Sequence, residues 1–116
     1  MCGIVGFFNT NTPETEQEEL LNKMSATLYS RGPDHGGIWV NKSIGLGLAH
    51  RRLSIIDLSR EGHQPMISSS GRFVIVFNGE IYNHLELREK LSEHAGQLLN
   101  WRGHSDTETL LSGFDV

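Results

Sequence analysis

A short apolar run at the start of the chain, directly behind its only cysteine, decides the first element of the fold. It reads Cys2-Gly3-Ile4-Val5-Gly6-Phe7-Phe8. Short apolar runs that contain β-branched and aromatic residues are typical of buried strands. We therefore expect a core strand over residues 2–8, with a thiol on its first residue.

Cys2 is also the most informative residue for chemistry. Only Met1 precedes it, so removal of Met1 would leave one residue with both a thiol and a free α-amine. A nucleophile needs a nearby base to take its proton, and an α-amine with a pKa of about 7.7–8.0 can be that base. The alternatives are a buried structural cysteine and a lipidation site, for which the chain has no supporting basic patch.

The composition describes a small globular domain. The chain has 116 residues, of which 37% are hydrophobic and 21% charged, and a formal net charge of −4. This length fits a single domain, and the acidic balance argues against nucleic-acid binding. One cysteine excludes an internal disulfide and fits a reducing compartment. Because the sequence shows neither a signal peptide nor a transmembrane run, we expect a cytoplasmic protein with no membrane partner.

The first half of the chain predicts a helix followed by two strands. Residues 15–18 (Thr-Glu-Gln-Glu) have the pattern of a capping box, and apolar residues follow at helical spacing. Gly and Pro within residues 31–34 end this helix. Residues 38–40 and 44–49 look like strands joined by a polar turn. Gly45 and Gly47 weaken the second strand, or they mark a close approach of backbone.

The second half predicts one clear strand and two helices. Residues 72–77 form the strand, and Asn78-Gly79 ends it as a turn pair. A helix is expected over residues 85–93, and a second capping box at residues 105–108 opens another helix. The chain stops at Val116, soon after that helix begins, so we expect an incomplete domain.

Polar segments at the ends of these elements carry the candidate chemistry, because sites are usually built there. A thiolate that attacks an amide needs donors aimed at the developing oxyanion. The side-chain amide of Asn78 and the backbone N–H of Gly79 would suit. The alternative interpretation of this pair is an ordinary hairpin turn.

A free amino acid as substrate would need one cation and nearby carboxylates. Arg52 could bind its carboxylate as a fork, and Glu80 and Asp106 could bind its ammonium group. The alternatives are a surface arginine, a solvated glutamate and a helix-cap aspartate. The six histidines lack the spacing of metal sites, and no phosphate-binding glycine loop is present, so we expect neither a metal nor a nucleotide cofactor in this chain.

Six stretches of the chain, taken together and in this order, resemble the glutaminase domain of asparagine synthetases, which are class II glutamine amidotransferases. The stretches span nearly the whole chain and are Met1-Cys2-Gly3-Ile4-Val5-Gly6, Arg31-Gly32-Pro33-Asp34, His50-Arg51-Arg52-Leu53-Ser54-Ile55-Ile56-Asp57-Leu58, Gln64-Pro65, Phe77-Asn78-Gly79-Glu80-Ile81-Tyr82-Asn83 and Ser105-Asp106-Thr107-Glu108.

The resemblance implies an α+β fold of the N-terminal-nucleophile hydrolase type, an α/β/β/α sandwich of antiparallel sheets. Residues 1–116 would form part of a type 2 glutamine amidotransferase domain that is incomplete at its C-terminus, with the synthetase domain absent. The same resemblance implies the site residues, which are Cys2 as nucleophile with its α-amine as base, Asn78 and Gly79 as oxyanion hole, Arg52 for the glutamine α-carboxylate, and Glu80 and Asp106 for the α-amino end.

In that family, glutamine forms a γ-glutamyl thioester, releases ammonia and leaves as glutamate. The implied partners are L-glutamine and the synthetase domain of the parent chain, which would bind ATP and magnesium. The Arg-Leu-Ser-Ile version at residues 52–55 favours the asparagine synthetase type. The alternatives are amidation of another carboxylate, such as a sugar acid in surface polysaccharide synthesis, and a non-catalytic glutamine-binding fragment. We expect the isolated chain to be weakly active or inactive, and to form homo-oligomers that cover exposed sheet.

Overall fold

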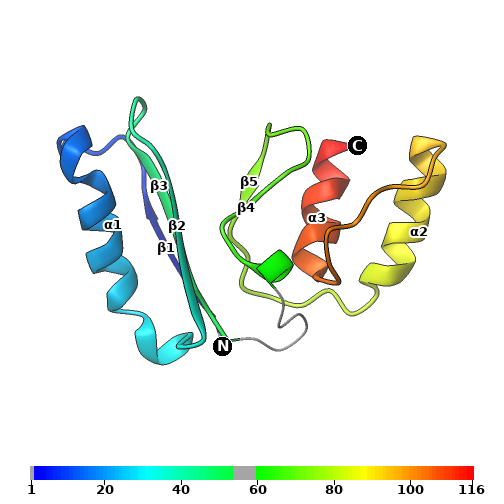
Figure 1. Ribbon diagram of the computed structural model, residues 1–116, viewed down its shortest axis with the longest axis horizontal. Helices are drawn as coiled ribbons and strands as arrows, with labels where there is room; N and C mark the ends of the chain where they lie inside the picture. Colours follow the sequence, from blue (N-terminus) through cyan, green and yellow to red (C-terminus); the bar gives the residue numbers. More distant parts are fainter. Residues whose placement is uncertain (1, 54–59) are drawn as a thin grey trace. The chain divides into compact units, whose positions relative to one another are not determined.

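The computed structural model describes residues 2–53 and 60–116, and the chain divides into two compact units whose elements are shown in Figure 1. Within these residues, the first unit holds residues 2–53, His63–Pro65 and Val76–Asn78, and the second holds residues 60–62, Met66–Ile75 and Gly79–Val116.

A three-stranded antiparallel sheet forms the centre of the first unit. Its strands are β1 (Gly3–Phe7), β2 (His35–Asn41) and β3 (Leu46–Arg52), in the order β1-β3-β2. The central strand β3 therefore pairs on both sides. The predicted first strand and the predicted strand pair are confirmed, although β3 starts and ends later than the apolar pattern indicated.

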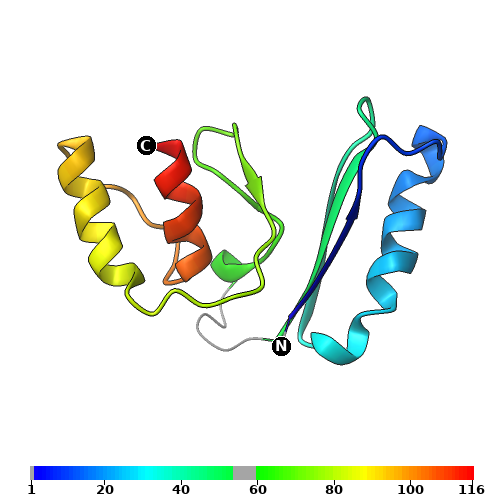
Figure 2. The ribbon, with the colours of Figure 1, turned by 180° about the vertical axis from the view of Figure 1, so that it is seen from behind.

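Helix α1 (Gln17–Ala26) lies along one face of this sheet, as both Figure 1 and Figure 2 show. Leu21 of α1 and Ala49 of β3 are fully buried. Alternation along the strands places Ala49 on the face that α1 covers, together with Gly3. A Cβ atom added to Gly3 would lie 3.2 Å from the Leu28 side chain that follows α1. The core of the first unit therefore lies between α1 and the sheet.

The helix was predicted correctly, but its capping box was not. A 3-10 turn, η1 (Glu14–Glu16), precedes α1 and places Thr15 inside a turn rather than at a helix boundary. Glu16 is the N-cap of α1 and makes no side-chain capping bond in the described structure. The helix also ends earlier than expected, and a second 3-10 turn, η2 (Tyr29–Arg31), leads into β2.

The second unit combines a small hairpin with two helices. Strands β4 (Met66–Ile67) and β5 (Val74–Ile75) pair in antiparallel fashion after the turn η3 (Arg60–Gly62). Helix α3 (Asp106–Asp115) packs against this hairpin and against α2 (His84–Ala95). The buried side chains of Met66 and Leu111 form its apolar centre. Both helices were predicted.

The predicted strand over residues 72–77 is only two residues long in the structure. A strand needs a partner backbone, and β4 offers two residues to pair with. The amides outside this short ladder bind side chains instead. The N–H of Phe73 donates to Ser68 Oγ, and the N–H of Phe77 donates to Gln64 Oε1. Asn78 and Gly79 are not a hairpin turn, because the described chain continues into α2.

The described residues therefore form an α+β structure with antiparallel sheets. Within residues 2–53 and 60–116, none of the helices combines the length and the apolar character that spanning a bilayer would require.

Gly47 has no room for a side chain, which explains a glycine inside the central strand. A Cβ atom at this position would lie 2.6 Å from the ring of Phe7 on β1. We expect Gly47→Ala to lower the free energy of unfolding by about 1–3 kcal/mol, because the Phe7 ring must move. Urea unfolding measures the change.

Gly113→Ala is the matched control. Gly113 lies in α3 with no atom within 4 Å of an added Cβ. The same substitution there should raise stability by up to about 1 kcal/mol, since alanine favours a helix more than glycine. Equal effects at the two positions would contradict the close approach at Gly47.

Candidate functional site

The strand register places the Cys2 thiol beside the end of β3. Gly3 pairs with Arg51 in the antiparallel ladder, so the residue before Gly3 lies next to the residues that follow Arg51. The backbone N–H of Leu53 donates to Cys2 Sγ at 3.4 Å, and the thiol lies 3.7 Å from the Leu53 carbonyl oxygen. Cys2 is half-buried. The thiol is therefore held against the chain directly after Arg52.

Two side chains converge on the carbonyl oxygen of Cys2. Asn78 Nδ2 donates to it at 2.9 Å and Arg31 Nε at 3.3 Å. A primary amide has two N–H donors, and the bond to Cys2 uses one of them. The structure thus brings Asn78 to Cys2 across 76 positions of sequence. Gly79 is the next residue along the chain.

Arg52 lies at the end of β3 with only 7% of its surface exposed. The segment over residues 32–34 holds the backbone of Arg52, because the N–H of Asp34 donates to the Arg52 carbonyl at 3.0 Å. The Gly32 carbonyl accepts from Arg51 Nε at 3.1 Å. The sequence marked residues 31–34 as a helix stop and as one of the stretches that carry the family resemblance. In the structure they also fix the end of β3, and Arg31 reaches Cys2.

The face of the sheet opposite α1 carries His50, which is 2% exposed. His50 Nε2 lies 3.3 Å from the Phe77 carbonyl oxygen. Burial lowers the pKa of His50 below its ordinary value. The hydrogen bond to Phe77 raises that pKa by less, and electrostatic interactions with Arg52 and His63 lower it further. His50 is therefore a neutral, hydrogen-bonded part of the core at physiological pH.

In the second unit, Asp106 is a buried carboxylate at the first residue of α3. Its Oδ2 accepts from the N–H of Ile81 at 2.7 Å. A carboxylate in the first turn also interacts favourably with the helix dipole. Glu80 directly precedes Ile81 and is exposed. This unit therefore brings Glu80 and Asp106 close together.

Ser105 caps α3 as the sequence predicted, since its side chain accepts from the N–H groups of Thr107 and Glu108. The other half of the capping box differs. The Glu108 carboxylate accepts from the backbone N–H groups of Arg102 and Gly103, which precede the cap, at 2.8 and 3.0 Å. Glu108 thus fixes the loop before α3.

Arg88 of α2 is a buried residue that the sequence did not mark. It donates to Thr109 Oγ1, to the Gly103 carbonyl and to the Ser105 carbonyl at 2.8–2.9 Å. Its guanidinium also lies 4.1 Å from the centre of the Trp101 ring and 3.8 Å from the Glu108 carboxylate. Arg88 therefore holds the start of α3, on which Asp106 lies.

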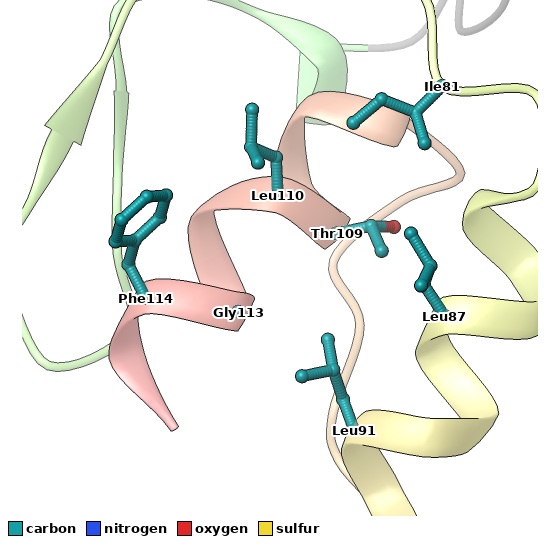
Figure 3. A pocket seen from close by; sticks show the side chains of 7 residues that line it. All are labelled: Ile81, Leu87, Leu91, Thr109, Leu110, Gly113 and Phe114. Atoms are coloured by element: carbon teal, nitrogen blue, oxygen red, sulfur yellow. The ribbon is translucent and has the colours of Figure 1, made fainter.

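A groove between α2 and α3 has a volume of about 290 Å³ (Figure 3). Thr109 brings a hydroxyl to a lining that is otherwise apolar or glycine, formed by Ile81, Leu87, Leu91, Thr109, Leu110, Gly113 and Phe114. A zwitterionic amino acid needs charged partners, which this lining lacks. Within the described residues, no group of three or more His, Cys, Asp or Glu side chains is placed to hold a metal ion.

We expect Arg88→Met to destabilise the second unit by about 3–5 kcal/mol, because it leaves the buried Glu108 carboxylate without its partner on α2. Unfolding in urea, followed by the fluorescence of Trp101, measures the loss. Lys23→Met is the control, since Lys23 forms an exposed ion pair with Glu19 at 3.2 Å. That change should cost less than about 1 kcal/mol. A small effect at both positions would show that Arg88 does not organise the unit.

Comparison with known proteins identifies the family. A family model described as a glutamine amidotransferase domain matches residues 1–115. The chain is 44% identical to the glutamine-hydrolyzing asparagine synthetase 1 of Bacillus subtilis strain 168 over 116 residues, which are 98% of this chain and 17% of that protein. It is 38% identical to asparagine synthetase 2 of the same strain over 96 residues, 81% of this chain and 12% of that protein.

A third relative is asparagine synthetase B of Escherichia coli strain K12, which is 36% identical over 112 residues, 97% of this chain and 19% of that protein. The chain thus spans less than a fifth of each of these three relatives. These matches confirm the resemblance drawn from the sequence. The chain belongs to the glutamine amidotransferase domain family.

Proposed function

We propose that this chain hydrolyses the side-chain amide of glutamine and supplies ammonia to an ATP- and magnesium-dependent synthetase domain that forms asparagine. The observation that carries the proposal is the contact of Asn78 Nδ2 with the Cys2 carbonyl at 2.9 Å. It joins the candidate nucleophile to the candidate oxyanion donor. The relatives named above are glutamine-hydrolyzing asparagine synthetases, which favours asparagine over a sugar acid as the product.

The chemistry begins with removal of Met1. The freed α-amine of Cys2 takes the thiol proton, and the sulfur attacks the side-chain carbonyl carbon of glutamine. The second N–H of Asn78 and the N–H of Gly79 stabilise the oxyanion. The intermediate collapses as the C–N bond breaks, and the α-ammonium group returns its proton to the leaving ammonia. Water then hydrolyses the thioester and releases glutamate.

Substrate binding is the second part of the proposal. Arg52 binds the α-carboxylate of glutamine, and its placement at the buried end of β3, next to the Cys2 thiol, supports this role. A guanidinium fork suits a carboxylate, since it offers two parallel hydrogen bonds. Glu80 and Asp106 bind the α-amino group. That assignment rests on the sequence resemblance, and their proximity within the second unit is compatible with it.

We further propose that the complete domain has the α/β/β/α sandwich of N-terminal-nucleophile hydrolases, of which residues 1–116 form one part. The first unit supplies one helix and one antiparallel sheet of such a sandwich. On the sheet face away from α1, Ile4 is 47% exposed. An apolar side chain at such a strand position is typical of a sheet that receives a second layer.

Cys2→Ala and Cys2→Ser test the nucleophile. Both variants should lower glutamine hydrolysis at least on the order of 1,000-fold, because no other group of the proposed site can form the thioester. Glutamate release in a coupled assay measures the rate, with each variant made in the complete protein that contains this sequence. Ser43→Ala, at an exposed turn, is the control and should keep full activity. Glutamine binding by the wild-type chain without turnover would favour a non-catalytic binding fragment.

Arg52→Lys tests substrate recognition. Lysine keeps the charge and loses the fork, so we expect KM for glutamine to rise about 10- to 100-fold with a smaller change in kcat. The same substitution at Arg72, an exposed residue of the second unit, is the matched control. A fall in kcat at unchanged KM would contradict the role of Arg52 in binding the α-carboxylate.

A further inference from the structure

We propose that His50 and Gln64 are positioning residues for Asn78, and that they act by fixing the backbone of Phe77 from both sides. This inference rests on the proposed function and adds two residues to it. Neither side chain touches the substrate in the proposed reaction. Both lie in the first unit, as do Phe77, Asn78 and Cys2.

Each backbone polar group of Phe77 makes one hydrogen bond to a side chain. Its N–H donates to Gln64 Oε1 at 2.6 Å, and its carbonyl oxygen lies 3.3 Å from His50 Nε2. A carbonyl can only accept, so we assign the ring hydrogen to Nε2. Both side chains are buried, with 2% of His50 and 7% of Gln64 exposed. Because Phe77 lies outside β5, these bonds take the place of a strand ladder.

A glycine on the neighbouring strand makes room for Gln64. Gly37 of β2 pairs with His50 of β3, and a Cβ atom added there would overlap the Gln64 carbonyl oxygen and lie 2.6 Å from His63 Nε2. His63 and Gln64 therefore lie directly against the sheet. This contact explains why the Gln64-Pro65 stretch, which the sequence marked only by resemblance, belongs to the site.

The position of Asn78 depends on this arrangement. Asn78 is exposed and lies outside any helix or strand. The hydrogen bonds that fix the Phe77 backbone therefore also determine where the Asn78 backbone lies, and so the point from which its side chain extends. The amide then reaches the Cys2 carbonyl. An oxyanion donor that moves by about 1 Å can cost on the order of 100-fold in rate. A loose Phe77 would therefore reduce kcat more than it changes KM.

The surroundings of His50 keep its ring in the form that the bond needs. Burial lowers the pKa of His50, and the electrostatic interactions with Arg52 and His63 act in the same direction. A neutral imidazole ring carries one N–H. The hydrogen bond to the Phe77 carbonyl oxygen favours the tautomer in which this hydrogen is on Nε2.

Two variants of His50 test the inference. His50→Leu removes the donor to Phe77, and His50→Gln replaces it with an amide nitrogen at a similar distance from the backbone. Leu21→Val is the matched control, because Leu21 is fully buried on the opposite side of the same sheet. Glutaminase kcat and KM are measured for each variant, together with the side-chain NH2 signals of Asn78 by ¹⁵N NMR, which Asn78→Asp identifies.

We expect His50→Leu to lower kcat on the order of 10- to 100-fold with KM within about threefold of wild type. The Asn78 NH2 signals should move to the position of a free amide. His50→Gln should restore most of kcat and the signals, and Leu21→Val should leave both unchanged. Wild-type kcat in His50→Leu, or an equal loss in Leu21→Val, would overturn the inference.

Failure of the proposed function looks different. In that case the complete protein that contains the wild-type sequence would hydrolyse no glutamine. The Asn78 NH2 signals would still decide whether His50 positions this side chain, since they do not depend on turnover. Unmoved signals in His50→Leu would overturn the inference in that case too.

Discussion

The antiparallel register between β1 and β3 is the constraint on which the candidate site depends. It pairs Gly3 with Arg51 and thereby sets the Cys2 thiol against Leu53, directly after Arg52. A slip of one residue would turn every side chain of β3 to the other face of the sheet. His50 and Arg52 would then face α1, and the thiol would lose its place. The close approach of Phe7 to Gly47 helps to prevent that slip, because a larger residue does not fit beneath the ring.

Polar contacts position the candidate residues in both units. The first unit holds Asn78 through the buried side chains of His50 and Gln64. The second holds Asp106 through Arg88, which binds the loop and cap before α3. Burying a charge costs free energy unless hydrogen bonds and a partner compensate for it. The contacts of Arg88 supply both, and they fix the start of α3 more specifically than apolar packing would.

Local patterns in the sequence predicted the elements that depend on local interactions. The strand after Cys2, the helix around Leu21 and the Ser105 cap follow from apolar spacing and side-chain chemistry. The predicted strand over residues 72–77 was wrong in length, since its apolar residues cannot show how short the partner strand is. The Thr15 cap was wrong because a 3-10 turn starts one residue earlier. Arg88 gave no signal, and Arg31 and His50 lay in stretches that the sequence marked without giving these two residues a role, because their partners lie far away in sequence. The roles of the named site residues followed from their chemistry, and family resemblance made those assignments specific.

The most direct test of the central claim is the intact mass of the chain after incubation with 6-diazo-5-oxo-norleucine, a glutamine analogue that alkylates nucleophiles of this kind. The account predicts a single adduct that maps to Cys2, on a chain from which Met1 has been removed. Prior addition of glutamine should slow its formation. A chain that lacks Met1 and gains its adduct at a residue other than Cys2 would contradict the assignment of Cys2 as the nucleophile of a glutamine site.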